Sequence, residues 1–156
     1  MVKRLRAKDY FTSQRDYFFL SCHINQTDSS NRHCHEYYEV EIIVRGAAAD
    51  EINGVSYALN SGEFLFLRPS DVHQLKAAGC EGADLVNLAV SVSLMHEVLS
   101  FLEIAEEQLF SPVIVGQLPQ ELLFLMSEQA QRFSAPIQCA SQERAFVKEW
   151  MTICLY

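Results

Sequence analysis

Turn residues divide residues 17–92 into apolar segments of strand length, and this spacing constrains the fold more than any other feature of the chain. The clearest turn is Asn53-Gly54, because this dipeptide accepts the positive φ angles of a two-residue hairpin. Gly62 and Pro69 mark two further turns between apolar segments. Short strands at such intervals are typical of an antiparallel barrel or sandwich.

The segment before Gly46 shows the alternation of an extended strand. Tyr38, Val40, Ile42 and Val44 alternate with Glu39, Glu41, Ile43 and Arg45. We therefore expect a strand that ends at Gly46, with one apolar face and one mostly polar face toward water. The other expected strands are residues 17–24, 49–52, 55–59, 64–67 and 85–92, with His73 near the start of one more.

The hydrophobic period changes from that of strands to that of helices after residue 92. Ser93 is placed to cap a first helix, Pro119 to start a second, and Pro136 to separate a third. The third helix has an apolar stripe, which we expect to pack on its own domain or on a second copy of the chain. The stripe consists of Val147, Trp150, Met151 and Cys154. Two segments follow: a barrel over residues 1–92 and a helical segment over 93–156.

The composition limits the class of protein. With 156 residues, 49% of them hydrophobic, the chain can form one domain with a real core. Its net charge of −8 argues against direct binding to nucleic-acid phosphates. Five cysteines without a Cys-x-x-Cys pair favour a reducing cytoplasm over a disulfide framework. No signal peptide or apolar run of membrane-spanning length is apparent, so no membrane partner is expected.

A candidate metal site combines His33, His35 and Glu39, at even spacing, with His73 beyond the hairpin. Even spacing places residues on one face of an extended strand. Imidazole and carboxylate together can hold a divalent metal such as Zn, Ni, Fe or Mn. The alternative is a polar barrel lumen in which the same groups bind sugar hydroxyls or one another by hydrogen bonds.

Three nearby residues are candidates for binding an organic ligand. Glu41 and Arg45 share the face of Glu39, and Arg45 could hold a phosphate or carboxylate in a fork. An Arg beside a strand-end glycine is more often solvated, which is the alternative for Arg45. Tyr37 could stack on a sugar ring.

The spacing His33-x-His35, three residues, Glu39, six residues, Gly46 resembles the first motif of the cupin superfamily, and Gly62 to His73 looks like the second. More narrowly, these motifs resemble the sensor domain of AraC-type transcription regulators, especially the chitobiose-operon type. The resemblance implies a mainly β fold, a cupin-like antiparallel barrel (double-stranded β-helix or jelly roll) followed by C-terminal α-helices. Ala77 stands where metal cupins have Asn, which weakens an enzymatic interpretation.

The resemblance implies a cytoplasmic regulator domain that senses a small-molecule effector, a sugar or sugar phosphate. It also implies a homodimer that binds DNA only through a helix-turn-helix domain absent from this sequence. No catalytic residues are assigned. The rival is a metal-dependent cupin enzyme, an isomerase or dioxygenase, which would use the same four residues. A storage or scaffold barrel is a third hypothesis, but it leaves the polar strand face unexplained.

Overall fold

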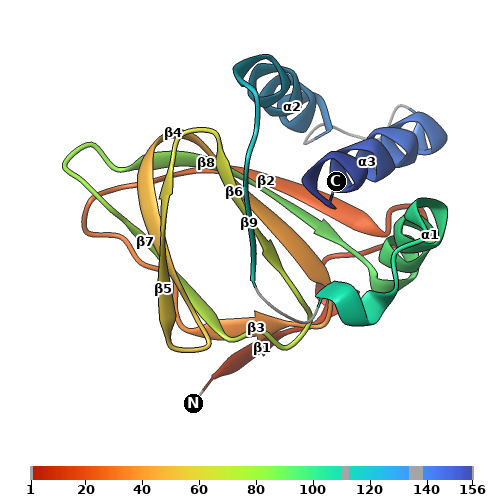
Figure 1. Cartoon of the computed structure of the whole chain (residues 1–156), viewed down its shortest axis with the longest axis horizontal. Helices are drawn as coiled ribbons and strands as arrows, with labels where there is room; N and C mark the ends of the chain where they lie inside the picture. Colours follow the sequence, from red (N-terminus) through yellow and green to blue (C-terminus); the bar gives the residue numbers. More distant parts are fainter. Residues whose placement is uncertain (1, 110–112, 134–138, 156) are drawn as a thin grey trace.

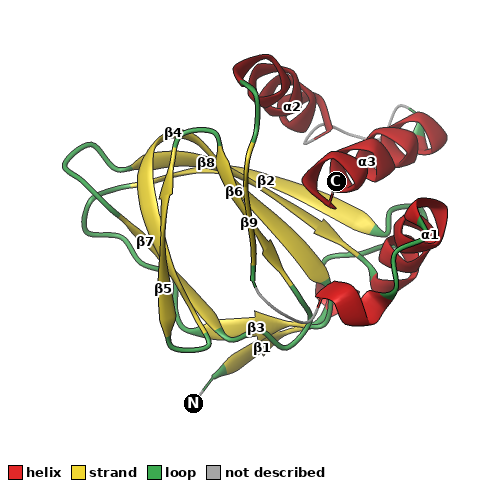
Figure 2. Ribbon diagram, in the orientation of Figure 1, coloured by secondary structure: helices red, strands yellow, loops and turns green. Residues whose placement is uncertain are grey.

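The structure is a computed structural model, and it describes residues 2–109, 113–133 and 139–155. In this part of the chain the strands curl into a barrel-like sheet, and the helices lie on one side of it (Figure 1). Figure 2 shows that the fold is rich in strands up to the first helix. The expected cupin-like barrel followed by helices is confirmed. None of these helices has both the length and the apolar character that a membrane crossing requires.

The elements follow the expected order closely. The strands are β1 Lys3–Leu5, β2 Tyr17–Ile24, β3 His33–His35, β4 Tyr38–Ile52, β5 Val55–Asn60, β6 Glu63–Leu67, β7 His73–Ala77, β8 Ala83–Val90 and β9 Ile114–Gln117. The α-helices are α1 Val92–Leu102, α2 Gln120–Phe133 and α3 Ala140–Leu155, and short 3-10 turns cover Ala7–Asp9 and Glu106–Leu109.

Strand β4 joins the two sheets of the barrel. Its first part pairs with β6 and β8, and its second part pairs with β5 and β7. The expectation that the strand ends at Gly46 is wrong, because Gly46 bends the strand without ending it. At Gly46 φ is +81°, and an added Cβ would lie 2.2 Å from the Gly82 carbonyl oxygen. Glycine therefore permits both the left-handed backbone and the close approach of the neighbouring strand.

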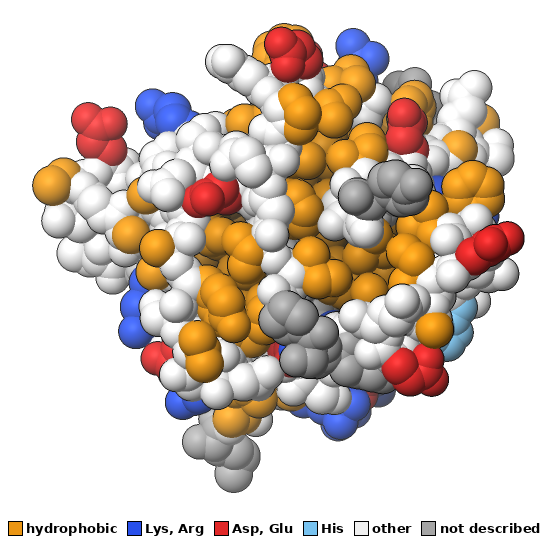
Figure 3. All heavy atoms as spheres, in the orientation of Figure 1, with side chains coloured by type: hydrophobic (Ala, Val, Ile, Leu, Met, Phe, Trp, Pro, Cys, Tyr) orange, Lys and Arg blue, Asp and Glu red, His pale blue; other side chains and the backbone are white. Residues whose placement is uncertain are grey.

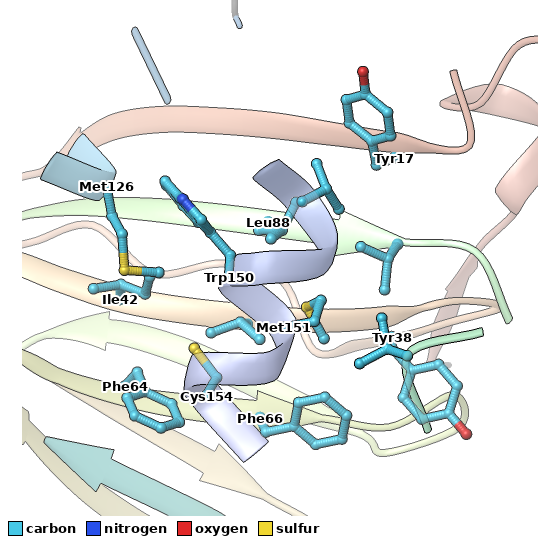
Figure 4. Packing of buried hydrophobic residues seen from close by; sticks show 14 of the residues in the cluster. Tyr17, Tyr38, Ile42, Phe64, Phe66, Leu88, Met126, Trp150, Met151 and Cys154 are labelled. Atoms are coloured by element: carbon cyan, nitrogen blue, oxygen red, sulfur yellow. The ribbon is translucent and has the colours of Figure 1, made fainter. Parts of the chain in front are cut away.

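The apolar face of β4 packs beneath the helices. In Figure 4 the side chains of Trp150, Met151 and Cys154 on α3 lie against Ile42 and other side chains of the sheet. The stripe on α3 is therefore buried within its own chain, as the simpler interpretation predicted. The polar face of β4 is not in water, contrary to expectation, because the barrel closes over it and buries Glu39 and Glu41.

The segment after residue 92 contributes to the barrel as well as covering it. Strand β9 pairs antiparallel with β6, and the helices share one hydrophobic core with the outer face of the sheet. Helix α1 is capped by Ser91, whose hydroxyl accepts from the amide of Leu94, so the expected cap at Ser93 is two residues late. Helix α2 begins directly after Pro119, as expected, and the Pro136 break lies outside the described residues.

We predict that Trp150→Ala lowers the free energy of unfolding by about 3–5 kcal/mol. Trp150 is 2% exposed, packs edge-on against Phe19 and donates to Gln129. Urea unfolding measures the change. Phe101→Ala on α1 is the control, because Phe101 is 78% exposed and its removal should cost no more than about 0.5 kcal/mol. Equal losses in both variants would contradict the packing of α3 on the sheet.

Candidate functional site

Three imidazoles meet inside the barrel. His33 and His35 lie on β3, and His73 begins β7, where it pairs in register with His33. The ring centroid of His73 lies 4.3 Å from that of His33 and 4.9 Å from that of His35. One nitrogen from each of the three rings lies within 4.8 Å of the others. Neighbouring strands thus bring together residues that are about forty positions apart in the sequence.

Glu39 completes the group expected from the sequence. Its Oε2 atom lies 3.0 Å from Nε2 of His35, and its Oε1 atom accepts from the amide of Asn87. The expectation of one continuous strand is wrong, because residues 36–37 interrupt the strand and separate β3 from β4. Both strands nevertheless direct these side chains into the lumen, so the structure brings His33, His35, Glu39 and His73 together.

Two residues of the site were missed from the sequence. Asp50 Oδ2 accepts from Nδ1 of His73 at 2.8 Å, and Asn87 lies opposite Glu41 on β8. Each is a polar residue within a mostly apolar strand, which is the signal that could have identified it. Their contacts depend on strand register, which the sequence pattern alone did not reveal.

The lumen shifts the pKa values of its ionisable groups. Burial lowers the pKa of His33, and the neighbouring His73 lowers it further. Burial also acts to lower the pKa of His73, but the hydrogen bond and charge of Asp50 outweigh it, so this pKa is raised. Burial raises the pKa of Glu41 well above its usual value, and the Asp50 and Glu39 carboxylates add to the effect. A lumen that concentrates negative charge therefore favours protons or other cations.

A cavity of about 320 Å³ lies beside these residues. Its volume suits a small polar molecule. The lining residues are Leu20, Cys22, Ile24, Asp28, Ser29, Ser30, His33, Glu39, Glu41, Leu75, Leu85 and Asn87. Of the three expected ligand-binding residues, only Glu41 is among them.

Tyr37 and Arg45 lie elsewhere. Tyr37 is buried, stacks on His35 and contacts the ring of Phe18. The side chain of Arg45 is 72% exposed and pairs with Asp84 at 2.6 Å. A register shift between Ile43 and Arg45 inserts a residue on β4, which reverses the alternation and turns Arg45 outward. The expectation that Arg45 shares the face of Glu39 is therefore wrong.

The ring nitrogens of the three histidines are suitable ligand atoms for a divalent metal. Nδ1 of His73 donates to Asp50, and Nδ1 of His33 donates to the Asn31 carbonyl, which leaves Nε2 of each ring available. Nε2 of His35 lies 3.2 Å from Nε2 of His73, and Nδ1 of His35 has no hydrogen-bond partner in the described structure. Orientation of imidazoles by carboxylate and carbonyl acceptors is the usual support of metal-binding histidines.

Comparison with known sequences identifies the family of this barrel. Residues 19–145 match the family described as the AraC-like ligand binding domain. The match spans most of the chain, so the chain belongs to this family.

The relatives are transcription regulators. The chain is 32% identical over 84 residues to the HTH-type transcriptional activators RhaS of Pectobacterium carotovorum and Pectobacterium atrosepticum. This match covers 54% of the chain and 29% of each activator, so the chain spans only a part of these relatives.

Solved structures of ToxT from Vibrio cholerae share the fold. An apo ToxT variant gives a TM-score of 0.69 at 11% identity, over 88% of this chain and 55% of that one. ToxT with bound unsaturated fatty acid gives 0.63 at 14% identity, over 87% and 52%.

We predict that Asp50→Asn lowers the pKa of His73, as read by NMR titration of the metal-free protein. A histidine whose pKa is raised by folding stabilises the fold below its unfolded pKa, and this stabilisation is lost as pH rises through the folded pKa. The stability difference between wild type and variant should therefore be larger at pH 5 than at pH 9, by about 1.5–3 kcal/mol.

Asp84→Asn is the matched control, because Asp84 pairs with His23 in an exposed position. Its pH-dependent effect should stay below about 1 kcal/mol. An Asp50→Asn difference that does not change with pH would contradict the assigned pairing of His73.

Proposed function

We propose that this chain is the effector-sensing domain of an AraC-family transcription regulator and binds a small polar molecule in the barrel cavity. The observation that supports it best is a cavity lined by His33, Glu39 and Glu41, in a chain of the AraC-like ligand binding family. Buried ionisable groups are costly to a fold unless they serve a ligand or one another. We infer a sensory rather than a catalytic use of this cavity.

The metal is part of the proposal. His33, His35, His73 and Glu39 would hold a divalent ion, Zn, Ni, Fe or Mn, inside the lumen. Such an ion would offset the charge of the carboxylates and present a Lewis-acidic centre to oxygen atoms of the effector. Asp50 would fix the ring of His73 through its hydrogen bond.

The residues that line the cavity support a hydroxylated effector. The ligands of ToxT include a fatty acid, but at 14% identity this likeness concerns the fold alone. A carboxylate placed here would meet Asp28, Glu39 and Glu41. Hydroxyl groups of a sugar suit these acceptors, and the finer resemblance to chitobiose-operon regulators also favours a sugar. A sugar phosphate is the second form of this proposal.

Strand β4 supplies the coupling. Glu39 and Glu41 face the cavity, whereas Val40 and Ile42 between them pack in the core beneath the helices. A ligand that prefers one position of β4 would therefore favour one arrangement of the helices. This is a population shift between two states of the barrel and the helices.

The proposed assembly is a cytoplasmic homodimer that binds DNA through a separate helix-turn-helix domain. Figure 3 shows hydrophobic side chains gathered over the centre of one face, with charged side chains toward its edge. On the helices, Phe101 and Phe124 are exposed. Apolar surfaces of this kind are used in contacts between proteins.

We predict metal in protein purified without chelator, measured by elemental mass spectrometry at close to one ion per chain. His33→Ala combined with His35→Ala should lose the ion, because two of four ligands are removed. Asp50→Asn should weaken metal binding by roughly 10–100-fold, because it removes support for His73. His96→Ala, far from the group on α1, is the control and should retain the metal. Metal-free wild type would favour a lumen held by hydrogen bonds alone.

The sensory role is tested with the intact regulator. Reporter transcription should change when sugars are supplied, and the change should disappear in Glu39→Gln, which alters the cavity wall. Indifference to every sugar and sugar phosphate would contradict the sensory role. Turnover of a substrate by the metal-loaded chain would favour the cupin isomerase or dioxygenase instead.

A further inference from the structure

Glu41 differs from the other buried carboxylates. It lies on β4, is 1% exposed and forms part of the cavity wall. Its Oε2 atom has no hydrogen-bond partner among the residues that the structure describes. A buried polar atom without a partner is costly, so its presence in a cavity wall indicates a ligand that supplies the missing donor.

Other buried acidic residues accept hydrogen bonds from the protein. Glu39 is held by His35 and Asn87, and Asp50 by His73 and the amide of Gln74. Glu143, which lies outside the barrel lumen, accepts from Tyr17 and Arg15. These acids have donors from the protein on their oxygens, whereas Glu41 retains a free acceptor.

Asn87 offers a second acceptor next to Glu41. The two residues are partners in the register of β4 and β8, and both line the cavity. The amide of Asn87 is used by Glu39, but its Oδ1 atom is buried and has no partner in the described part of the chain. The cavity wall thus presents two neighbouring acceptors, one of them a carboxylate.

The charges around the cavity are of one sign. Asp28, Glu39 and Glu41 line it, and none of the described lining residues is Lys or Arg. Arg45, the expected partner for an anion, points outward to Asp84. A phosphate or carboxylate would therefore lack a basic side chain and meet like charges, whereas a cationic donor would be attracted.

We infer that Glu41 and Asn87 form a subsite for the ammonium group of the effector, which is a small hydroxylated amine. An ammonium group has three donors and no acceptor, so it can satisfy both free acceptors at once, and a hydroxyl group has only one donor. Charge-assisted hydrogen bonds of this type are the stronger ones. The inference rests on the proposed sensory function and narrows its effector from sugars in general to those bearing an amine.

The first experiment uses the unliganded chain. Glu41→Gln should raise the melting temperature by about 2 °C or more, because it removes a buried acidic group that lies close to Asp50 and Glu39 and has an oxygen without a partner. Glu143→Gln is the matched control, since Glu143 is also buried, at 5% exposed, but its Oε2 atom accepts from both Tyr17 and Arg15. This control should melt at a lower temperature than wild type. A fall in both variants would overturn the inference, because Glu41 would then be structural.

The second experiment tests the ligand class by calorimetry and thermal shift, with and without added zinc, in amine-free buffer. The compounds are D-glucosamine, D-glucose and D-glucose 6-phosphate, which share one ring and differ in charge, together with 2-amino-1,3-propanediol. The amines should bind wild type, and Glu41→Gln should weaken them at least tenfold, because an amide cannot pair with the ammonium charge.

The outcomes separate the subsite from the sensory role. If glucose or its phosphate binds and the amines do not, the ammonium subsite is wrong and the sensory role stands. Amine binding that is unchanged in Glu41→Gln would place the ligand elsewhere and also overturn the subsite. If none of the compounds binds, the subsite is overturned, and the reporter experiment with the intact regulator decides the sensory role.

Discussion

The first part of β4, residues 38–43, is buried on both faces, and the rest of the structure depends on this constraint. Its inner face carries Glu39 and Glu41 into the lumen, and its outer face carries Val40 and Ile42 into the core under the helices. A strand held from both sides cannot move without disturbing one of its contacts. The ligand cavity and the helical layer are therefore mechanically connected by a single backbone.

The local patterns of the sequence predicted most of the fold. Turn residues such as Asn53-Gly54 act within a few positions, so the strands around them could be identified. Residue type and even spacing likewise indicated the four residues that meet in the lumen, His33, His35, Glu39 and His73. Strand β1 was not expected, because three residues without alternation carry no recognisable pattern.

The predictions that failed concerned residues whose position depends on the register between strands. Asp50 and Asn87 join the site only because β4 pairs with β7 through its second part and with β8 through its first part, each in one particular register. The shift beside Ile43 reverses the direction of Arg45, and nothing in the alternation of residue types marks it. The alternation of residues along a strand predicts the direction of side chains only as far as the first β-bulge.

The lumen buries ionisable groups that are costly to the fold. Three carboxylates, Glu39, Glu41 and Asp50, are buried close to imidazoles inside one small barrel. Such a group opposes folding unless cations or donors compensate it. Anything that binds the folded lumen and not the unfolded chain then stabilises the fold by mass action. Under the proposed function, the same residues would make the stability of the domain depend on whether the lumen is occupied.

The short strand β1 also protects the sheet. Lys3–Leu5 runs parallel to β3 and pairs with His33–His35 along the side that β7 does not cover. Without those residues β3 would be an open edge, and open edges recruit strands from other molecules. Strand β1 therefore covers the edge of β3. Removal of β1 would leave the two histidines on an open edge strand, which could pair with a strand of a neighbouring chain.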